Sequence, residues 1–311
     1  MKRTNRKQHL MTLLLTTFIF IIGLAETSFC RRDRYVSFGP TLHYFDYVET
    51  RDDGTYLDSE RNVESPAGGR YPMIGLNARA QYTFDSMFFV YGNFELTYFN
   101  TQYDGFLMPW FTPFQTRTNN LFLRFEINFG HTFRLTPIFS ISPYIGFGLR
   151  FWSRDITSSA GYLEHYSWFY FPIGFKLSID IGKSLSIGLD ASIRFMSMGR
   201  MKAFFKDSGH YNADVLVDLP SRMIYRIEIP VNIYFNSKYG FSIIPWYNYS
   251  AIGKSAVDYN FQQITGETFW EPQSRTHQVG VNLNFTIYFG NSTPPEPEPN
   301  RNQTALQILS R

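Results

Sequence analysis

Two sets of residues in this sequence have the side-chain types that hydrolytic chemistry requires. Asp207 and His210 lie three positions apart, and Asp52-Asp53 form an acidic pair far upstream. An Asp–His pair facing carboxylates can activate a water molecule for attack on a scissile bond. Ser250 and His277 offer a second arrangement, a hydroxyl nucleophile with a histidine base. Both sets also have a plainer interpretation, which we favour, as solvated residues in loops and at strand ends.

The sequence contains no motif for a metal or a cofactor. Cys30 is the only cysteine, so no cysteine pair exists, and neither a His-x-x-x-His nor an Asp-x-Asp-x-Asp-Gly pattern is present. Zinc and calcium sites are recognised by such spacings. We therefore expect neither a bound metal nor a cofactor.

Most of the remaining candidate residues lie in ten segments where apolar and polar residues alternate. One of them, 280–289, reads Gly-Val-Asn-Leu-Asn-Phe-Thr-Ile-Tyr-Phe. Successive side chains of a strand point to opposite faces, so each segment has one apolar and one polar face. Most segments are about twice the usual strand length of about 5–6 residues. This pattern is typical of a transmembrane β-barrel, which is apolar toward lipid and polar toward its lumen.

The fold class that follows is all-β, a ten-stranded antiparallel up-and-down transmembrane barrel. An even number of strands brings both ends of the barrel to the same side of the membrane. The predicted strands are 34–49, 71–84, 87–99, 117–129, 138–152, 166–181, 184–196, 223–236, 239–251 and 273–289.

Short and long connections alternate along the chain, which orients the barrel. Short turns of bacterial barrels face the periplasm and long loops face the exterior. The short connections are 85–86, 130–137, 182–183 and 236–238, and the long ones are 50–70, 100–116, 153–165, 197–222 and 252–272. Because binding residues concentrate on loops held by a rigid scaffold, we expect function in the five long loops.

The second long loop contains the most apolar stretch of any long connection. An exposed apolar patch often marks an interaction site, so this stretch is a candidate interaction patch. Folding over the barrel mouth, or extension of an aromatic girdle, is favoured over partner binding. The residues of this patch are Phe106, Leu107, Met108, Trp110, Phe111 and Phe114.

Placing the apolar face of each strand outward puts eleven ionisable residues in the lumen, six cations against five anions. Buried charges are costly unless they are paired. A barrel of ten strands is only slightly wider than the eight-stranded kind, whose interior side chains can fill. We therefore predict a charge-paired network that plugs the lumen. Its members are Arg79, Glu95, Arg124, Glu126, Arg150, Lys176, Asp180, Asp190, Arg194, Arg226 and Glu228.

The two ends of the chain are predicted to lie outside the barrel, which spans 34–289. Residues 1–25 have a basic start, an apolar run and small residues at the end, the pattern of a cleaved secretory signal peptide. A short periplasmic segment, 26–33, follows it. The Pro/Glu-rich stretch 290–311 is predicted to be a periplasmic tail. Four of the positive charges lie in the signal peptide, so the formal net charge of +3 becomes 3 − 4 = −1 without it. We therefore expect no nucleic-acid partner.

Several short motifs resemble those of a family of outer-membrane β-barrel proteins of uncharacterised function. Pro143–Phe151 reads Pro-Tyr-Ile-Gly-Phe-Gly-Leu-Arg-Phe, and Gly161-Tyr162 and Tyr170–Gly174 follow it. Trp270-Glu271-Pro272, a few residues before the last strand, resembles the Glu-Pro element of the same family. The resemblance implies an outer-membrane location and a barrel fold, and it brings no established activity.

The function we expect is a structural or loop-mediated binding role in the outer membrane, without enzymatic activity. Outer-membrane lipid, lipopolysaccharide and the barrel-assembly machinery are the expected partners. A narrow channel for small solutes is one alternative, although selective pores usually carry a surplus of one sign. An outer-membrane hydrolase, omptin-like or lipid A-modifying, is the other. Omptin proteases space their pair as Asp-x-His, which Asp207 and His210 do not match.

Overall fold

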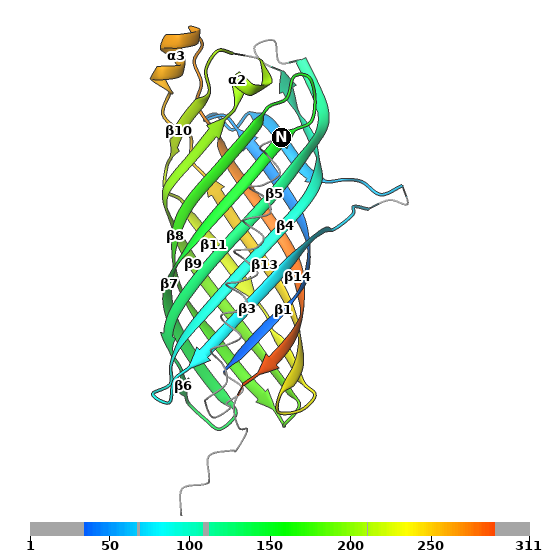
Figure 1. Cartoon of the computed structure of the whole chain (residues 1–311), viewed down its shortest axis with the longest axis vertical. Coiled ribbons are helices and arrows are strands. Elements are labelled where there is room, and N and C mark those ends of the chain that lie inside the picture. Colours follow the sequence, from blue (N-terminus) through cyan, green and yellow to red (C-terminus); the bar gives the residue numbers. More distant parts are fainter. Residues whose placement is uncertain (1–33, 67–68, 108–111, 210, 290–311) are drawn as a thin grey trace, which may run out of the picture.

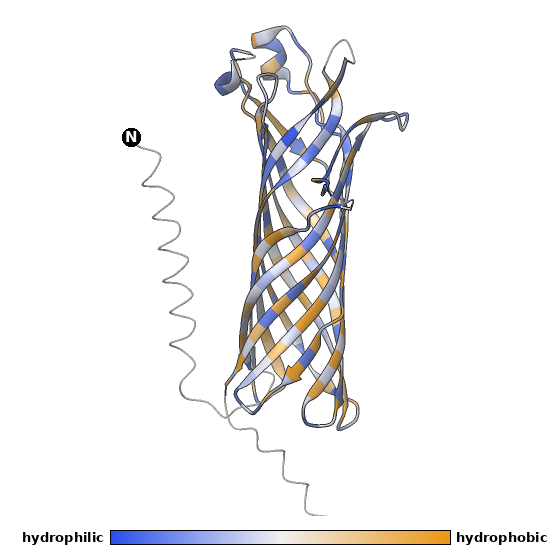
Figure 2. Ribbon diagram, turned by 90° about the vertical axis from the view of Figure 1, so that its right-hand side faces the viewer, coloured by the Kyte–Doolittle hydropathy of each residue, from blue (hydrophilic) through white to orange (hydrophobic). Residues whose placement is uncertain are grey.

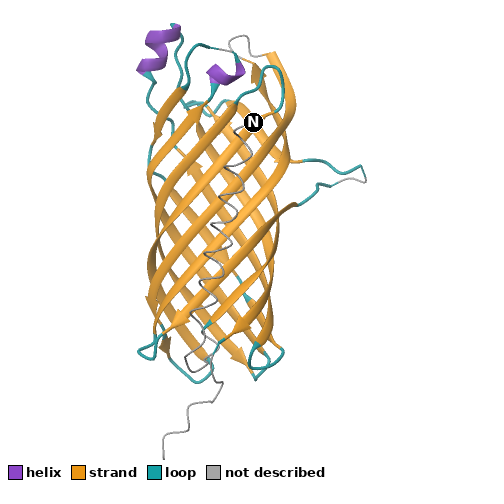
Figure 3. Cartoon of the chain, in the orientation of Figure 1, coloured by secondary structure: helices purple, strands orange, loops and turns teal. Residues whose placement is uncertain are grey.

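The computed structural model describes residues 34–66, 69–107, 112–209 and 211–289, which form a closed antiparallel barrel (Figures 1 and 3). The predicted signal peptide, the segment 26–33 and the Pro/Glu-rich tail lie outside the described residues. The first strand, β1 (Tyr35–Thr50), pairs with the last, β14 (Gln273–Tyr288), and this pairing closes the wall. The ten-stranded prediction is confirmed.

Eight of the ten positions in the wall are single long strands. Besides β1 and β14 they are β4 (Phe88–Leu107), β5 (Thr112–His131), β7 (Phe139–Ile156), β8 (Leu163–Ile181), β9 (Leu185–Ala203) and β13 (Tyr239–Ile252). The other two positions are each built from more than one strand. A short strand, β6 (Phe133–Arg134), extends the edge of β7 at one end.

The second position in the wall is built from two strands in line. β3 (Met73–Thr83) pairs with the first halves of β1 and β4, whereas β2 (Tyr56–Asn62) pairs with Asp46–Thr50 and Thr101–Asp104. Between β2 and β3 the chain leaves the wall and projects sideways (Figure 1). The prediction of a loop over 50–70 was therefore wrong for β2, whose acidic sequence lacks an apolar face.

The position between β9 and β13 is divided into three pieces. β11 (Met223–Glu228) pairs with both neighbours, as does β12 (Val231–Tyr234), and Pro230 separates them. Proline has no N–H to donate to a ladder, which explains the break. The third piece, β10 (Val215–Leu219), pairs only with the upper end of β9 among the described strands. On its other edge, the Leu216 amide donates to Asp258, the N-cap residue of α3, at 2.9 Å.

The strands run further into the predicted loops than the sequence indicates. The ladder between β4 and β5 continues to the pair Leu107 and Thr112, so most of the predicted loop 100–116 is strand. β7 and β9 likewise extend to Ile156 and Ala203. The outward residues of these extensions are largely polar, so the apolar alternation that revealed the lower wall is weak there.

The two ends of the barrel differ. Tight turns join strands at one end, and the long loops gather at the other, with the helices α2 (Phe205–Ser208) and α3 (Tyr259–Thr265) (Figure 3). Neither α2 nor α3, the helices among the described residues, has the length and apolar character needed to cross a membrane. We call the end with the helices the upper end, following the view in Figure 1.

Alternation along the strands produces the two faces of the wall. Outward side chains such as Ile145, Ile173 and Leu76 are 55–63% exposed in the isolated chain, and hydrophobic residues are frequent along the wall toward the lower end (Figure 2). Inward positions carry polar groups, as the parity argument requires, but they also carry many aromatic rings. Tyr91, Trp152 and Tyr166 are at most 4% exposed. The interior is therefore not the purely polar surface that the sequence predicted.

Candidate functional site

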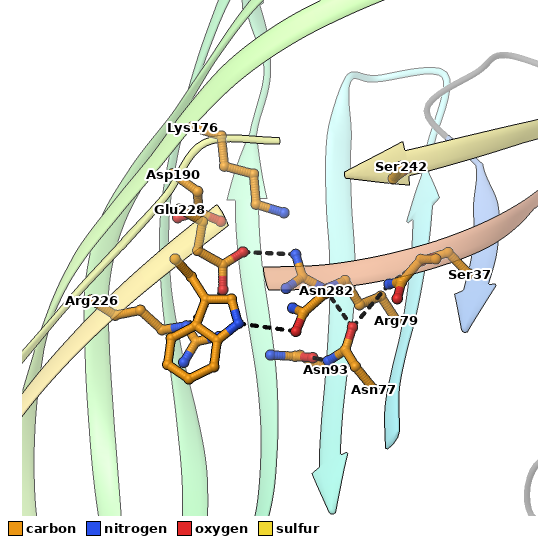
Figure 4. A network of polar contacts seen from close by, with 12 residues as sticks. Ser37, Asn77, Arg79, Asn93, Lys176, Asp190, Arg226, Glu228, Ser242 and Asn282 are labelled. Carbon is orange, nitrogen blue, oxygen red and sulfur yellow. Dashed lines mark hydrogen bonds and ion pairs between the residues drawn. The ribbon is translucent and has the colours of Figure 1, made fainter. Parts of the chain in front are cut away.

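The charged residues of the lower lumen form a continuous chain of ion pairs across the barrel. Arg79 on β3 contacts Glu228 on β11 at 2.7 Å, and Arg226 contacts the same carboxylate at 2.6 Å (Figure 4). Arg226 also lies 3.5 Å from Glu95, which Arg124 contacts at 2.6 Å. All five side chains are 10% exposed or less. We call this set, Arg79, Glu95, Arg124, Arg226 and Glu228, the lower network.

A second pairing extends the lower network toward β9. Arg194 lies 2.8 Å from Glu126, and the Tyr170 hydroxyl donates to the same carboxylate at 2.9 Å. Asn128 donates to the other Glu126 oxygen at 2.8 Å. Because each lone pair of a buried carboxylate must be satisfied, Glu126 is held by partners from three strands.

Three predicted lumen residues have aromatic or polar partners. The Lys176 ammonium lies 3.4 Å from the centroid of the Tyr91 ring and donates to Gln81 at 3.2 Å. Asp190 accepts a hydrogen bond of 2.6 Å from the Tyr144 hydroxyl. The Arg150 guanidinium lies over two rings, Phe122 and Trp168, at 4.8 and 5.1 Å. Cation–π contacts of this kind stabilise a desolvated cation.

Asp180 lies at the lower rim of the barrel wall. It is exposed, near the lower end of β8, and it pairs in register with Ser186. The structure thus brings ten of the eleven predicted residues into the interior and leaves Asp180 at the rim. A carboxylate so close to a strand end meets solvent whichever face of the strand it occupies.

A layer of aromatic rings lies above the lower network. Along β7, consecutive inward positions are Arg150, Trp152 and Arg154, so Trp152 separates two charged levels. Its indole lies 5.1 Å from the Phe122 ring and 4.8 Å from the Tyr166 ring, and Phe45 packs 5.6 Å from Phe122. Sequence reasoning missed this layer because it assigned apolar residues to the lipid face.

Above the aromatic layer, one arginine meets several carboxylates. Arg154, 2% exposed, lies 2.5 Å from Glu60 and 2.9 Å from Glu164. It also lies 3.3 Å from Glu49 and 3.5 Å from Asp58. These residues come from four different strands, β1, β2, β7 and β8, so the arrangement can form only in the folded barrel.

Hydroxyl groups complete this arrangement. Tyr47 donates to Glu49, and Tyr103 donates to Asp58 at 3.1 Å. The Tyr166 hydroxyl lies 3.1 Å from Glu164 and 2.8 Å from Glu271, which follows α3. We call Glu49, Asp58, Glu60, Arg154, Glu164 and Glu271 the upper cluster.

The upper cluster contains more negative charge than its cation can neutralise. Five carboxylates surround one guanidinium, and all are buried. Burial, together with the neighbouring Glu164, raises the pKa of Glu271 well above its usual range. A tyrosine hydroxyl has one hydrogen, so Tyr166 can donate to Glu164 or Glu271 but not to both. A protonated Glu271 that donates to the Tyr166 oxygen satisfies all three groups.

The upper cluster was missed by sequence reasoning for identifiable reasons. The predicted strand 138–152 ends before Arg154, and the predicted loop 50–70 includes β2. The signal was present, because Asp58, Glu60 and Asn62 alternate with other residues and all three are buried. Among the described residues, no group of three or more His, Cys, Asp and Glu side chains is arranged to hold a metal ion.

The predicted hydrolytic residues are not assembled into a site in the part of the chain that the structure describes. Ser250 is buried and pairs in register with Thr276, whereas His277, the next residue, faces outward and lies 2.8 Å from the Tyr247 hydroxyl. The two side chains therefore lie on opposite faces of the wall. Asp52 pairs with Lys254 at 2.6 Å. His210 lies outside the described residues.

The predicted apolar patch lies at the end of the β4–β5 hairpin. Phe106 packs edge-on against Tyr56 at 6.2 Å, and Phe114 packs against Tyr103 at 5.9 Å. The two described rings thus contact residues that flank the upper cluster. Leu107 ends β4, and Met108, Trp110 and Phe111 lie outside the described residues.

Solved structures of outer-membrane proteins have the same architecture. The outer-membrane protease OmpT from Escherichia coli matches with a TM-score of 0.53 at 9% identity, over 85% of this chain and 99% of that one. The fold is that of an OmpT-like ten-stranded barrel.

The chain thus has the fold of an outer-membrane β-barrel protein.

Other similar outer-membrane structures have lower scores. OprG from Pseudomonas aeruginosa matches at 12% identity with a TM-score of 0.29, over 82% of this chain and 97% of that one. The toluene transporter TodX from P. putida matches at 9% identity with a TM-score of 0.30, over 85% and 92%. No protein-family model and no curated protein sequence matches this chain. At 9% identity, the match to OmpT establishes the fold of the barrel and leaves its activity open.

Proposed function

We propose that this barrel is sealed and non-conducting, and that it has a structural or binding role carried by its outer rim. The observation that supports the proposal most strongly is the succession of layers inside the wall. A solute that followed β7 upward would meet Arg150, Trp152 and Arg154 in turn, each 8% exposed or less. Side chains therefore take up the space that a pore would need.

The space left inside the lower network supports the same proposal. A cavity of about 10 Å³ lies beside Glu126, Asp190 and Glu228. A cavity needs roughly 10–15 Å³ to hold one water molecule. An open channel would require a continuous file of water, which this cavity cannot contain.

The outer loops add a cover at the upper end. Phe205 of α2 and Phe261 of α3 are buried, with their ring centroids 5.7 Å apart, and Phe269 packs against both. Two long loops thus meet over the lumen through aromatic contacts. A rim held together by such contacts is suited to presenting a defined surface to a partner.

Solute flux into liposomes tests the proposal. Proteoliposomes containing the folded barrel should swell in isosmotic glycine or arabinose no faster than protein-free liposomes. A general porin in matched liposomes is the positive control. Swelling above the protein-free rate would contradict a sealed lumen and favour the narrow channel.

We also propose that the protein acts without catalysis. The separation of Ser250 from His277 across the wall supports this for a serine hydrolase. The purified barrel should leave peptide libraries and lipid A unchanged over prolonged incubation. Cleavage that disappears in a His210→Ala or His277→Ala variant would overturn this part of the proposal.

A further inference from the structure

A cleft of about 870 Å³ lies at the upper part of the wall, where β9, β11, β13 and β14 approach the outer loops. Small-molecule sites typically occupy roughly 300–1,000 Å³. The link that follows β10 contributes Ser221 and Arg222 to the lining of the cleft. Its lining combines exposed residues of the outer wall with the buried Met196, Ile252 and Ser274, and it includes no residue of the lower network or the upper cluster.

One side of the cleft is apolar and faces away from the lumen. Phe195, Met223 and Tyr225 line it and are 40%, 51% and 41% exposed. Tyr225 and Tyr249 stack with their ring centroids 6.1 Å apart, and the small side chain of Ala251 lies above Tyr249 on the same face. Exposed rings and a thioether on the outer wall of a membrane barrel are suited to contact with an acyl chain.

The other side of the cleft carries two exposed arginines. Arg222 lies in the link between β10 and β11, where its carbonyl accepts a hydrogen bond of 3.2 Å from the Met196 amide. Arg275 lies on β14 between Val48 and Ala251, so neither neighbour across the ladder is acidic. Among the described residues, neither arginine forms an ion pair.

Two other outward arginines of the upper wall, Arg200 and Arg61, differ in this respect. Arg200 lies 3.2 Å from Asp218, and Arg61 lies 3.0 Å from Asp46. These two guanidinium groups already have carboxylate partners on neighbouring strands. The cleft therefore holds a local excess of positive charge beside an apolar surface.

The height of the cleft coincides with the change from apolar to polar side chains along the outer wall. On β14 the outward residues are Val279, 54% exposed, then His277 and then Arg275. On β9 the outward Ile193 and Phe195 precede Arg200. Aromatic residues mark the membrane interface of such barrels, and the charged rim begins above them. The two arginines thus lie at the level of lipid headgroups.

We propose that this cleft binds a phosphorylated lipid of the outer leaflet. Arg222 and Arg275 contact its phosphate groups, and an acyl chain lies along Phe195, Met223 and Tyr225. Guanidinium groups bind phosphate through paired, charge-assisted hydrogen bonds, which makes arginine well suited to this role. The lipid would fill the cleft beside the link between β10 and β11 and bind the barrel on its membrane face, independently of what the outer rim binds.

Native mass spectrometry of the full barrel in a neutral detergent tests the proposal with lipid A as the probe. The wild type should retain one tightly held lipid A. The double variant Arg222→Gln/Arg275→Gln should bind it on the order of tenfold or more weakly, since each charge-assisted contact is strong. A control, Arg134→Gln/Lys183→Gln, removes two exposed cations at the lower end and should bind like the wild type. Heat-dependent gel mobility verifies that each variant is folded.

Two further probes distinguish the contribution of the headgroup from that of the acyl chain, and binding of the lipid from binding of free phosphate. Dephosphorylated lipid A should bind the wild type about as weakly as lipid A binds the double variant. Inorganic phosphate at millimolar concentration should not displace lipid A. Equal affinity of the wild type and the double variant, equal affinity for dephosphorylated lipid A, or displacement by phosphate alone would each overturn the proposal. None of these outcomes depends on whether the lumen conducts.

Discussion

The lower network and the upper cluster are both built from buried charges, yet their charge balance is opposite. The lower network sets Arg79, Arg124 and Arg226 against Glu95 and Glu228. The upper cluster sets Arg154 alone against five carboxylates. In the first, charges neutralise one another with redundancy. In the second, a single cation and bound protons must neutralise five carboxylates. The two regions should therefore respond differently to mutation and to pH.

The largest effect is expected from removing the single cation of the upper cluster. Arg154→Gln leaves Glu49, Asp58, Glu60 and Glu164 without a counter-charge, and breaking a buried pair costs about 3–5 kcal/mol. Urea-induced unfolding of the barrel in lipid vesicles, followed by tryptophan fluorescence, measures the loss.

The exposed arginine Arg200 provides the matched control for that measurement. Its pair with Asp218 is 66% and 85% exposed at the two side chains, so Arg200→Gln should change the free energy of unfolding by less than about 1 kcal/mol. If the two variants lost stability equally, the special position of Arg154 would be refuted.

A smaller loss is expected from the lower network. Glu228→Gln keeps an oxygen that can accept from Arg79 or Arg226, and Arg226 retains Glu95 as a partner. We expect a loss of about 1.5–3 kcal/mol, the range for hydrogen bonds to charged groups. The same unfolding experiment measures it. A loss larger than that of Arg154→Gln would reverse the comparison between the regions.

The pH dependence of Glu271 gives the third test. Its pKa is raised in the folded barrel by burial and by Glu164, so folding favours the protonated form. The contribution of this group to stability is complete below its unfolded pKa of about 4.3 and is lost as the pH rises toward the folded value.

Glu271→Gln removes this dependence and keeps an oxygen near Tyr166. At pH 8 the variant should be more stable than the wild type by about 1.4 kcal/mol for each unit of pKa shift. The difference should vanish near pH 4. A variant that is less stable than the wild type at pH 8 would show that Glu271 is ionised in the folded barrel.

The same comparison shows how far the sequence predicts the structure. Alternation over segments such as 184–196 and 280–289 predicts strands correctly, because one face must meet lipid. That argument also predicts the residues of the lower network, since Arg79, Glu95 and Arg226 share strands with strongly apolar outward neighbours. The prediction is weaker in the upper wall, because the outward residues there are polar and hydrophobicity no longer distinguishes the two faces of a strand.

Alternation of apolar and polar residues does not predict the upper cluster or the aromatic layer, for two different reasons. β2 and the end of β7 lack the apolar outward face, so Glu60 and Arg154 were not recognised as inward residues. Trp152 and Tyr166 are inward although they are aromatic, because rings packed against rings and guanidinium groups fill a lumen as well as polar chains do. Which face is the lipid face cannot be decided from hydrophobicity alone when the interior is rich in aromatic residues.

We propose that these two charged regions and the rings between them seal the lumen. Planar-bilayer recording of the folded, purified barrel at molar salt and moderate voltage tests it most directly. The account predicts no discrete conductance steps from inserted wild-type protein whose folding has been verified by heat-dependent gel mobility. Reproducible steps of uniform size would contradict it and would identify the barrel as a channel.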